Sequence, residues 1–406
     1  MTGGCQMPGS CSVADERAFD AIARARPVLK GLVAARMVVD AGDHVLLHAG
    51  PPFISFSEVP APVRNSALAA MLFEGWCASR AEGLRMLADG VVKLEPAQDH
   101  RCVVPLASVL SPSQQVQVVH DAAGCGKDAY SSLNGGNGPA LRLGLPGDDV
   151  VAHLRWLNGP LADALRPAFD KGIHLLPIAD QALVDGDDLH GRTAAATKGL
   201  LAECGPLATG DAAQDARVAD FLSNSPSFFL NLWMAAVKCM LSAGEGVHEA
   251  GVVTAMGANG VRAGVQFAAR PGVWHAAPSS VPQGAWPSDL PAERALPAIG
   301  DSAILEAFGL GAMAMDYAPA QQAALGGYMP ASSSKLSTQL LHGAHPGFPR
   351  SGLRFGLCAD AVKRAGITPA VALGVLDALG ERGRITGGIW QAPRALFEEF
   401  PRSTQP

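Results

Sequence analysis

Three histidines stand beside acidic residues or turns, at places where an imidazole could move a proton. His48 follows an apolar, strand-like run and precedes a Gly-Pro-Pro turn, a pattern that presents side chains at the carboxyl end of a sheet. His100 follows an aspartate, and His190 lies three residues after Asp187, so that these two share one face if the segment is helical. Each histidine is a candidate general acid or base, with Glu74 and Asp187 as candidate supporting carboxylates. The structural alternatives are a strand end, a chance Asp-His pair, a solvated turn and a buried hydrogen-bonding glutamate.

Turns rich in glycine and amide side chains supply candidate anion-binding groups. The segment YSSLNGGNG at 130–138 offers Asn134, Gly135 and Gly136, whose successive N–H groups can form an anion-binding nest. The segment lacks the lysine of a P-loop, which disfavours a nucleoside triphosphate. Arg192 adds a planar guanidinium suited to carboxylate or phosphate. A glycine-rich connector and an ordinary ion pair are the structural alternatives.

Five further residues occupy positions that suit either a ligand or plain structure. Gly300, Asp301 and Ser302 begin a predicted helix, where free N–H groups attract anions but where capping is also ordinary. Asn231 lies in an apolar helical segment, and an amide there usually hydrogen-bonds within the core. Asn259 stands in an Asn-Gly turn between strand-like runs, which a β-hairpin explains.

The composition excludes several classes of protein. The net charge is −6 and no Lys/Arg run occurs, which argues against nucleic acid as a partner. No apolar stretch approaches the roughly 18–20 residues of a membrane-spanning helix. Eight cysteines are scattered through the sequence without a CxxC pair, which predicts reduced thiols in the cytoplasm. The sequence has no HxH or HExxH motif, and we expect neither a metal nor a cofactor. Because only 17% of the residues are charged, we expect some surface to be buried in a homo-oligomer.

The hydrophobic pattern predicts an α+β or mixed α/β fold that positions these groups. We expect four parts: an N-terminal α/β domain at 1–147, a mostly helical region at 148–250, an α/β segment completing the site at 251–346, and a small, mostly helical C-terminal unit at 347–406. Local patterns predict a strand at 43–47, a hairpin around 257–260, and helices at 28–39, 63–81, 228–240 and 369–382.

The polar clusters occur in an order that resembles a known family. The motifs are LLHAGPP at 46–52, FEGW at 73–76, DH at 99–100, SPS at 111–113, YSSLNGGNG at 130–138, LRWLNGPL at 154–161, GDDLHGRTAAAT at 186–197, FFLNLWMAAVK at 228–238, VVTAMGANG at 252–260 and IGDSAILEAFGLG at 299–311. With them the chain resembles the YlbE-like family, one branch of which supplies a subunit of the oxamate carbamoyltransferase of anaerobic allantoin breakdown. The family often has His-Asn-Arg at 190–192 and Glu-His at 99–100, where this chain has His-Gly-Arg and Asp-His.

The resemblance implies carbamoyl chemistry. A carbamoyl group moves between a nitrogen of an oxalurate-like ureido acid and phosphate, which gives or uses carbamoyl phosphate. Such a reaction needs an anion site for phosphate, donors such as Arg192 for the oxyanion, and a proton for the leaving nitrogen from a histidine. We therefore expect His48, Asn134, His190, Arg192, Asn259 and Asp301 to line one cleft.

The resemblance also implies companion subunits. This chain could then contribute only part of the active site, or no part of it. Two other interpretations stay open. One is a non-catalytic scaffold subunit of a transferase, and the other is a stand-alone amidohydrolase acting on a small ureido or amide compound.

Overall fold

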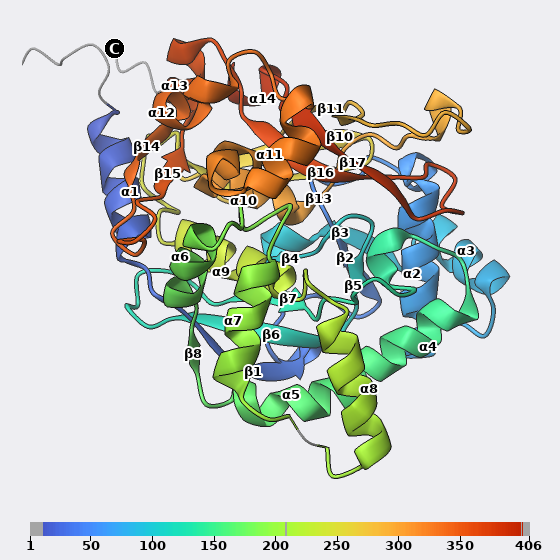
Figure 1. The fold of residues 1–406 in the computed structure, drawn as a ribbon. Coiled ribbons are helices and arrows are strands. Elements are labelled where there is room, and N and C mark those ends of the chain that lie inside the picture. The colour runs from blue at the N-terminus through green and yellow to red at the C-terminus, as the bar shows by residue number, and fades with distance from the viewer. Residues whose placement is uncertain (1–10, 208, 399, 401–406) are drawn as a thin grey trace, which may run out of the picture.

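Valine-rich segments near the beginning of the chain pair into a five-stranded sheet. The computed structural model describes residues 11–207, 209–398 and 400. The strand order is β4 (Cys102–Val103), β7 (Ala129–Ser132), β6 (Gln115–Asp121), β1 (Pro27–Ala34) and β8 (Ile173–His174). β-Branched side chains favour this extended backbone, and Val33 of β1 lies opposite Val116 of the antiparallel β6. This sheet forms much of the lower half of the molecule in Figure 1.

Three smaller sheets and a hairpin complete the β-structure of the described residues. The sheet nearest in sequence has the order β3 (Lys93–Pro96), β2 (Val45–His48), β5 (Val109–Leu110). The second has β11 (His275–Pro278), β10 (Arg262–Phe267), β9 (Val253–Asn259), β13 (Ile299–Gly300). The third has β12 (Gln283–Gly284), β17 (Arg384–Gln391), β16 (Ala370–Leu376), and the hairpin joins β14 (Leu341–Ala344) to β15 (Arg354–Leu357).

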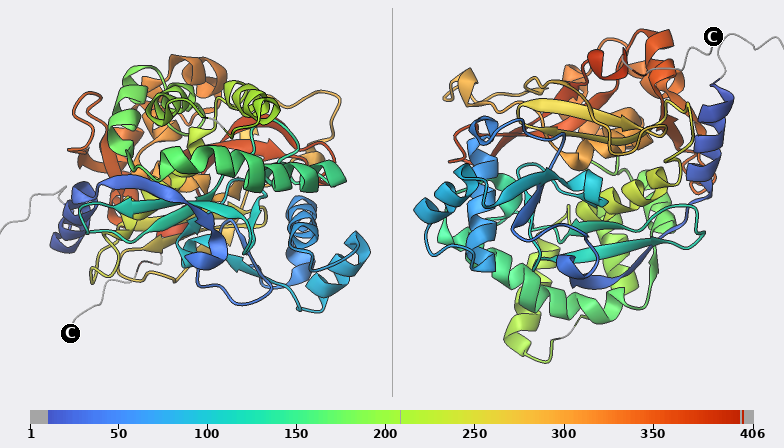
Figure 2. Two further views of the ribbon diagram at one scale, coloured as in Figure 1. Left: turned by 90° about the horizontal axis from the view of Figure 1, so that it is seen from below. Right: turned by 180° about the vertical axis from the view of Figure 1, so that it is seen from behind.

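Helices connect and cover these sheets. Those before and within the central region are α1 (Val13–Arg24), α2 (Ala61–Glu74), α3 (Arg80–Ala88), α4 (Asp148–Trp156), α5 (Ala162–Phe169), α6 (Leu175–Val184), α7 (Ala194–Cys204), α8 (Ala212–Ser223) and α9 (Phe229–Ser242). Those that follow are α10 (Ile304–Phe308), α11 (Pro319–Leu325), α12 (Leu336–Leu340), α13 (Ala359–Ala365) and α14 (Ala395–Glu398). The predicted helical character of the region 148–250 is confirmed, and α5, α6 and α9 of this region pack against the five-stranded sheet (Figure 2).

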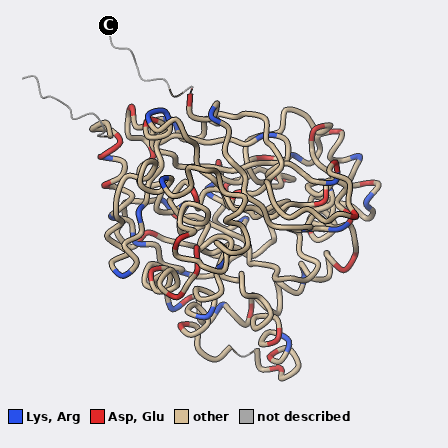
Figure 3. The backbone as a smooth tube through the Cα atoms, turned by 45° about the horizontal axis from the view of Figure 1, so that its top comes forward, with Lys and Arg blue, Asp and Glu red and all other residues tan. Residues whose placement is uncertain are grey.

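Helix α9 forms the centre of the core. It packs against β6 and β7 of the five-stranded sheet and also against β9 and α10, so it joins the two halves of the chain. Nearly all of its side chains are buried among the chain's own elements. Its apolar run is therefore explained by the fold of a single chain, and the homo-oligomer stays a prediction. Lys/Arg and Asp/Glu are interspersed along the backbone (Figure 3), and in the described residues no helix combines the length and apolarity that crossing a bilayer requires.

The mixed α/β class is confirmed, as are the strand that ends at His48 and the hairpin of β9 and β10. Three local predictions are wrong. The segment 28–39 is largely strand β1 rather than helix, and 369–382 contains strand β16, so the C-terminal unit carries two long strands beside its short helices. Both segments are apolar on nearly every residue, and periodicity cannot separate a buried strand from a buried helix. The helix predicted at 63–81 ends at Glu74, because Gly75 adopts a left-handed conformation with φ of +74°.

Candidate active site

A polar cavity of about 120 Å³ lies where three parts of the chain meet. The loop after β7 supplies one wall, the loop between α6 and α7 supplies a second, and β16, β17 and α11 supply a third. The lining is completed by Pro105, Leu106, Ser227, Leu230 and Ser302. Its polar lining consists of Asn134, Asn137, Arg142, His190, Ser227, Ser302, Gln321 and Arg384. No aspartate or glutamate lines it among the residues that the structure describes. The cavity is therefore positively charged.

Two guanidinium groups give the cavity this charge. Arg142 donates from Nη2 to the carbonyl of Gly136 at 2.7 Å, and its buried Nε has no partner in the described structure. Arg384 lies at the rim across Gly374 and Gly387, where a Cβ atom would come within 3.1 Å of its guanidinium. Burial, followed by the charge of Arg384, lowers the pKa of Arg142 to about 10, and burial also lowers the pKa of Arg384. Two like charges with no acidic partner in the described lining are an arrangement that suits a small anion.

His190 lines the same cavity and is held by a buried glutamate. Its Nδ1 lies 2.7 and 2.9 Å from the two carboxylate oxygens of Glu306, and the amides of Ala312 and Ala372 also donate to Oε1. Burial opposes a charged imidazole, but the Glu306 carboxylate outweighs burial and raises the pKa of His190. Because Nδ1 is occupied, Nε2 is the nitrogen left for a ligand. Gly311, with φ of +59°, makes room, since a Cβ there would lie 2.1 Å from Glu306 Oε1.

The loop that carries His190 is not the helical turn that the sequence suggested. Leu189 has a left-handed conformation with φ of +59°. The Asp188 carboxylate accepts hydrogen bonds from the backbone amides of His190 and Arg192 at 2.9 and 2.8 Å. An aspartate that bonds to amides two and four residues ahead stabilises a tight turn. The turn directs His190 inward and Arg192 outward.

Asn134 anchors the glycine-rich loop to the central helix. Its Nδ2 donates to the carbonyl of Ser227 at 3.0 Å and to Asn231 Oδ1 at 3.1 Å. Its Oδ1 accepts from the amide of Gly136 at 2.9 Å, so this N–H is used within the loop rather than offered to an anion. Gly135 of the same loop lines a separate small pocket together with Asn231. Asn134 lines the cavity, whereas Asn231 holds Asn134 from behind.

Asp301 and Ser302 have different surroundings although they are adjacent. The Asp301 carboxylate is fully buried and accepts from the amides of Gly50 and Val104 and from Gln98 Nε2, at 2.7 to 3.1 Å. Burial raises the pKa of Asp301 to about 7. Asp301 thus ties three loops together beneath the cavity, and Ser302 belongs to the cavity wall.

Gly300 and Asn259 also serve the backbone. Gly300 has φ of +120°, and a Cβ there would lie 2.8 Å from the amide nitrogen of Leu106. Asn259 donates to the carbonyl of Pro51 at 2.8 Å and accepts from the amide of Arg262 at 2.8 Å, which closes the hairpin turn. Neither residue belongs to the cavity lining.

The other two predicted histidines lie outside the cavity lining. His48 is buried with Nδ1 2.8 Å from the carbonyl of Ala49, and burial lowers its pKa to about 4, so its ring is neutral at pH 7. Its Nε2 is buried without a partner in the described structure. His100 uses both nitrogens, at 2.9 Å from the carbonyl of Asp40 and 2.9 Å from Glu95 Oε2.

The predicted carboxylates and Arg192 likewise make structural contacts. Glu74 Oε1 accepts from the Ser111 hydroxyl at 2.6 Å and from the Ser113 amide at 2.7 Å. Arg192 Nε lies 3.4 Å from Asp187 Oδ1, and the arginine side chain is 44% exposed. Of the residues predicted from the sequence, the structure thus brings Asn134, His190 and Ser302 together in one cavity.

Sequence reasoning missed Arg142, Arg384, Gln321 and Glu306. The two arginines stand near glycines but without an adjacent histidine or acidic motif that would single them out, and they are 242 positions apart in the sequence. Glu306 lies within the quoted motif IGDSAILEAFGLG, where a lone acid in an apolar helical turn was a usable signal for a buried partner.

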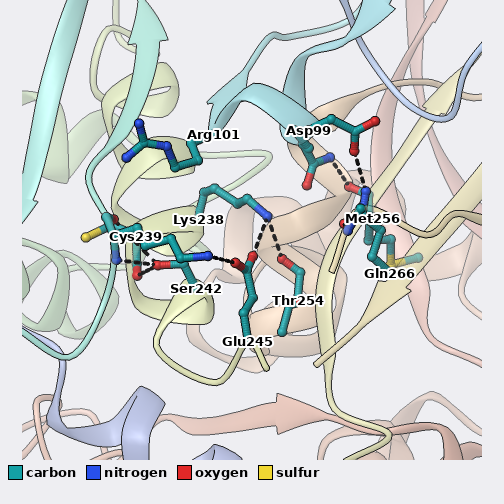
Figure 4. A network of polar contacts seen from close by, with 12 residues as sticks. Asp99, Arg101, Lys238, Cys239, Ser242, Glu245, Thr254, Met256 and Gln266 are labelled. Carbon is teal, nitrogen blue, oxygen red and sulfur yellow. Dashed lines mark hydrogen bonds and ion pairs between the residues drawn. The ribbon is translucent and has the colours of Figure 1, made fainter. Parts of the chain in front are cut away.

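A second buried polar network lies between α9 and β9 (Figure 4). Lys238 is 2% exposed, and its Nζ lies 3.1 Å from Glu245 Oε1 and 3.2 Å from the carbonyl of Thr254. Lys127 reaches the other oxygen of Glu245 at 3.0 Å from the surface. Burial pushes the pKa of Glu245 up, but the two lysines offset this and hold it below its ordinary value. The network joins α9 to β9 in the core, and its residues do not line the cavity.

This ion pair makes a stability prediction. Glu245→Gln leaves the Lys238 ammonium buried without its counter-charge, which we expect to lower the free energy of unfolding by about 3 kcal/mol. Lys127→Met removes an exposed partner and is expected to cost about 1 kcal/mol or less. Urea denaturation at pH 7 measures both. Equal, small losses for the two variants would contradict a buried ion pair that matters for stability.

The fold and the cavity define a mixed α/β protein with a cationic site that carries a histidine. A family model described as oxamate carbamoyltransferase subunit AllG matches residues 92–302. The Escherichia coli (strain K12) protein of that name is 32% identical over 406 residues, covering 96% of each chain. The chain belongs to this family, which confirms the resemblance to an oxamate carbamoyltransferase subunit. The YlbE-like label stays a prediction.

Two further proteins are similar to this chain over nearly its whole length. The uncharacterized protein YahG of Escherichia coli (strain K12) is 30% identical over 405 residues, which are 96% of this chain and 84% of that protein. A crystal structure of a conserved protein of unknown function from Enterococcus faecalis V583 superposes with a TM-score of 0.88 at 29% identity, covering 95% of both chains.

Proposed function

We propose that this chain is a subunit of a carbamoyltransferase and that the cavity around Arg142, Arg384 and His190 binds its anionic substrates. The observation that carries the proposal is the pairing of two guanidinium groups with a glutamate-held histidine in one cavity whose described lining has no acid. A small carboxylate or phosphate supplies the negative charge that this lining lacks. The likeness to a protein named as a subunit supports work within a multi-subunit enzyme.

The proposed reaction moves a carbamoyl group between an oxalurate-like ureido acid and phosphate. A phosphate oxygen attacks the carbamoyl carbon, the bond to the ureido nitrogen breaks, and that nitrogen takes a proton to leave as the amide of oxamate. His190 donates this proton from Nε2 and recovers it in the reverse direction. Arg142 and Arg384 hold the carboxylate and the phosphate and stabilise the charge that develops on the carbamoyl oxygen.

The remaining cavity residues orient the substrate. Asn134 and Gln321 offer amide groups and Ser302 offers a hydroxyl, and all three lie in the wall of the cavity. Glu306 does not reach the cavity wall and acts through His190, by fixing the ring and favouring its protonated form. It is therefore a positioning residue.

An activity assay of the chain together with its companion subunits tests this proposal. With carbamoyl phosphate and oxamate we expect oxalurate and inorganic phosphate in equal amounts, and with oxalurate we expect carbamoyl phosphate only when phosphate is added. Release of ammonia from oxalurate without phosphate would indicate an amidohydrolase instead. Full activity of an assembly whose His190→Gln chain still binds the companion subunits would indicate a scaffold.

A further inference from the structure

A cluster of metal-binding side chains lies far from the cavity, where helix α1 meets the hairpin of β14 and β15. Cys11 lies just before α1, Glu16 lies in the first turn of α1, and His342 comes from β14. Figure 1 shows α1 beside β14, although the two are distant in the sequence. One donor atom from each of the three residues lies within 4.8 Å of the other two, and all three side chains are half-buried.

We propose that Cys11, Glu16 and His342 bind a thiophilic divalent metal ion such as Zn²⁺. The Cys11 Sγ atom lies 4.0 Å from His342 Nδ1, and His342 Nε2 lies 3.6 Å from Glu16 Oε2. Sulfur and nitrogen ligands of a tetrahedral zinc ion are about 3.5 Å apart, so Cys11 Sγ and His342 Nδ1 must approach by about half an ångström. Glu16 faces the other ring nitrogen, so its half-exposed side chain must also turn toward Cys11 to bind the same ion. Thiolate, imidazole and carboxylate together are a donor set typical of zinc.

The buried Cys358 offers a second sulfur beside Cys11. Its thiol hydrogen-bonds to Cys11, although Cys358 lies outside the set of donor atoms that are all within 4.8 Å of one another. Cys358 precedes α13, so a fourth ligand from this residue joins one more part of the C-terminal region to α1. Binding replaces the thiol protons by the metal ion and releases them to solvent.

The surroundings already hold the ligands in place. The His342 ring stacks on Phe19 of α1 at 4.3 Å with an interplanar angle of 16°, and Phe355 covers its edge at 5.8 Å. Gly356, with φ of +86°, lets the backbone approach Phe19, because a Cβ there would lie 2.4 Å from the ring. A fixed imidazole costs less conformational entropy on binding a metal. The site would thus fasten α1 to the C-terminal region.

Metal titration of the reduced full-length chain tests the proposal. Cobalt(II) is expected to bind one to one and give the near-ultraviolet charge-transfer band of a thiolate–cobalt bond, and zinc is expected to displace it. Cys11→Ser and His342→Gln are expected to weaken zinc binding at least about tenfold and remove the band, because each removes a ligand. Zinc should raise the melting temperature of the wild-type chain and not that of these variants.

Cys125→Ser and His120→Gln are matched controls, because Cys125 is partly exposed and His120 pairs with Asp128 at the surface, both away from the cluster. They should bind zinc like the wild type. Absence of the band in the reduced wild-type chain, or a band that survives Cys11→Ser, would overturn the proposal. Loss of the band in the control variants would overturn it as well.

Discussion

Replacing His190 by glutamine is expected to lower the rate of carbamoyl transfer by about 10²- to 10⁴-fold, the usual contribution of a general acid or base. Glutamine keeps a polar side chain of similar length but cannot exchange a proton near neutral pH. His190 is the histidine whose unoccupied nitrogen is available to the cavity. Steady-state kinetics of the assembled enzyme measure the loss, and a melting curve shows whether the fold is kept.

His100→Gln is the matched control, because both ring nitrogens of His100 are used away from the cavity. It should keep the wild-type rate within about threefold, an effect below 1 kcal/mol. If the two variants lost activity equally, the assignment of the proton transfer to His190 would be wrong.

The Glu306→Gln variant tests whether Glu306 acts on His190 or only stabilises the fold. The carboxylate raises the pKa of His190, so the imidazole stays protonated at higher pH than an ordinary histidine. In the direction that forms carbamoyl phosphate, activity falls as pH rises through this pKa, because the protonated ring is the donor. Without the Glu306 charge the fall is expected at lower pH. An unchanged pH profile with a lower rate would indicate a purely structural role for Glu306.

Replacing Arg142 or Arg384 by methionine is expected to weaken catalysis by roughly 10- to 150-fold each, from the loss of about 1.5–3 kcal/mol in charge-assisted hydrogen bonds. We expect a larger loss in the double variant, because the cavity then has no guanidinium in its lining. Arginine to lysine at either position should restore charge but only part of the rate, since the planar fork is lost.

Arg192→Met is the control for these variants. Arg192 is half-exposed and pairs with Asp187 on the outer side of its loop, so its loss is expected to change the rate less than about threefold. Steady-state kinetics of all these variants under one set of conditions measure the losses. If Arg192→Met lowered the rate as much as Arg142→Met, the anion-binding role would belong to the loop at 186–192 instead.

The parts of the fold that the sequence could predict carry a local signal. The hairpin of β9 and β10 follows from alternating apolar residues around Asn259 and Gly260, a turn that needs a positive φ at the glycine. The apolar length of α9 likewise marks a buried helix. The predictions for 28–39 and 369–382 were wrong because an apolar run has no period that separates a buried strand from a buried helix. Strand β1 pairs with β6, which is distant in the sequence, and β16 pairs with the neighbouring β17.

The candidate site divides in the same way. Asn134, His190 and Ser302 stand in glycine-rich or capping motifs, and these motifs pointed to the cavity wall. Arg142 and Arg384 come close together only in the folded chain, because more than two hundred positions separate them in the sequence. A local motif therefore could not identify them as a pair. Asn259, Asp301 and Glu74 sit in equally suggestive motifs, but their hydrogen bonds hold neighbouring loops together, through backbone groups and the side chains of Gln98 and Ser111. The motifs therefore identified residues with structural hydrogen bonds as often as residues that line the cavity.

A crystal structure of the chain with oxamate and phosphate tests the central claim most directly. The account predicts electron density for oxamate in the cavity, with its carboxylate on the guanidinium groups of Arg142 and Arg384 and its amide within hydrogen-bonding reach of His190 Nε2. Density for the ligand beside Arg192, or an empty cavity at ligand concentrations that support full turnover, would contradict it.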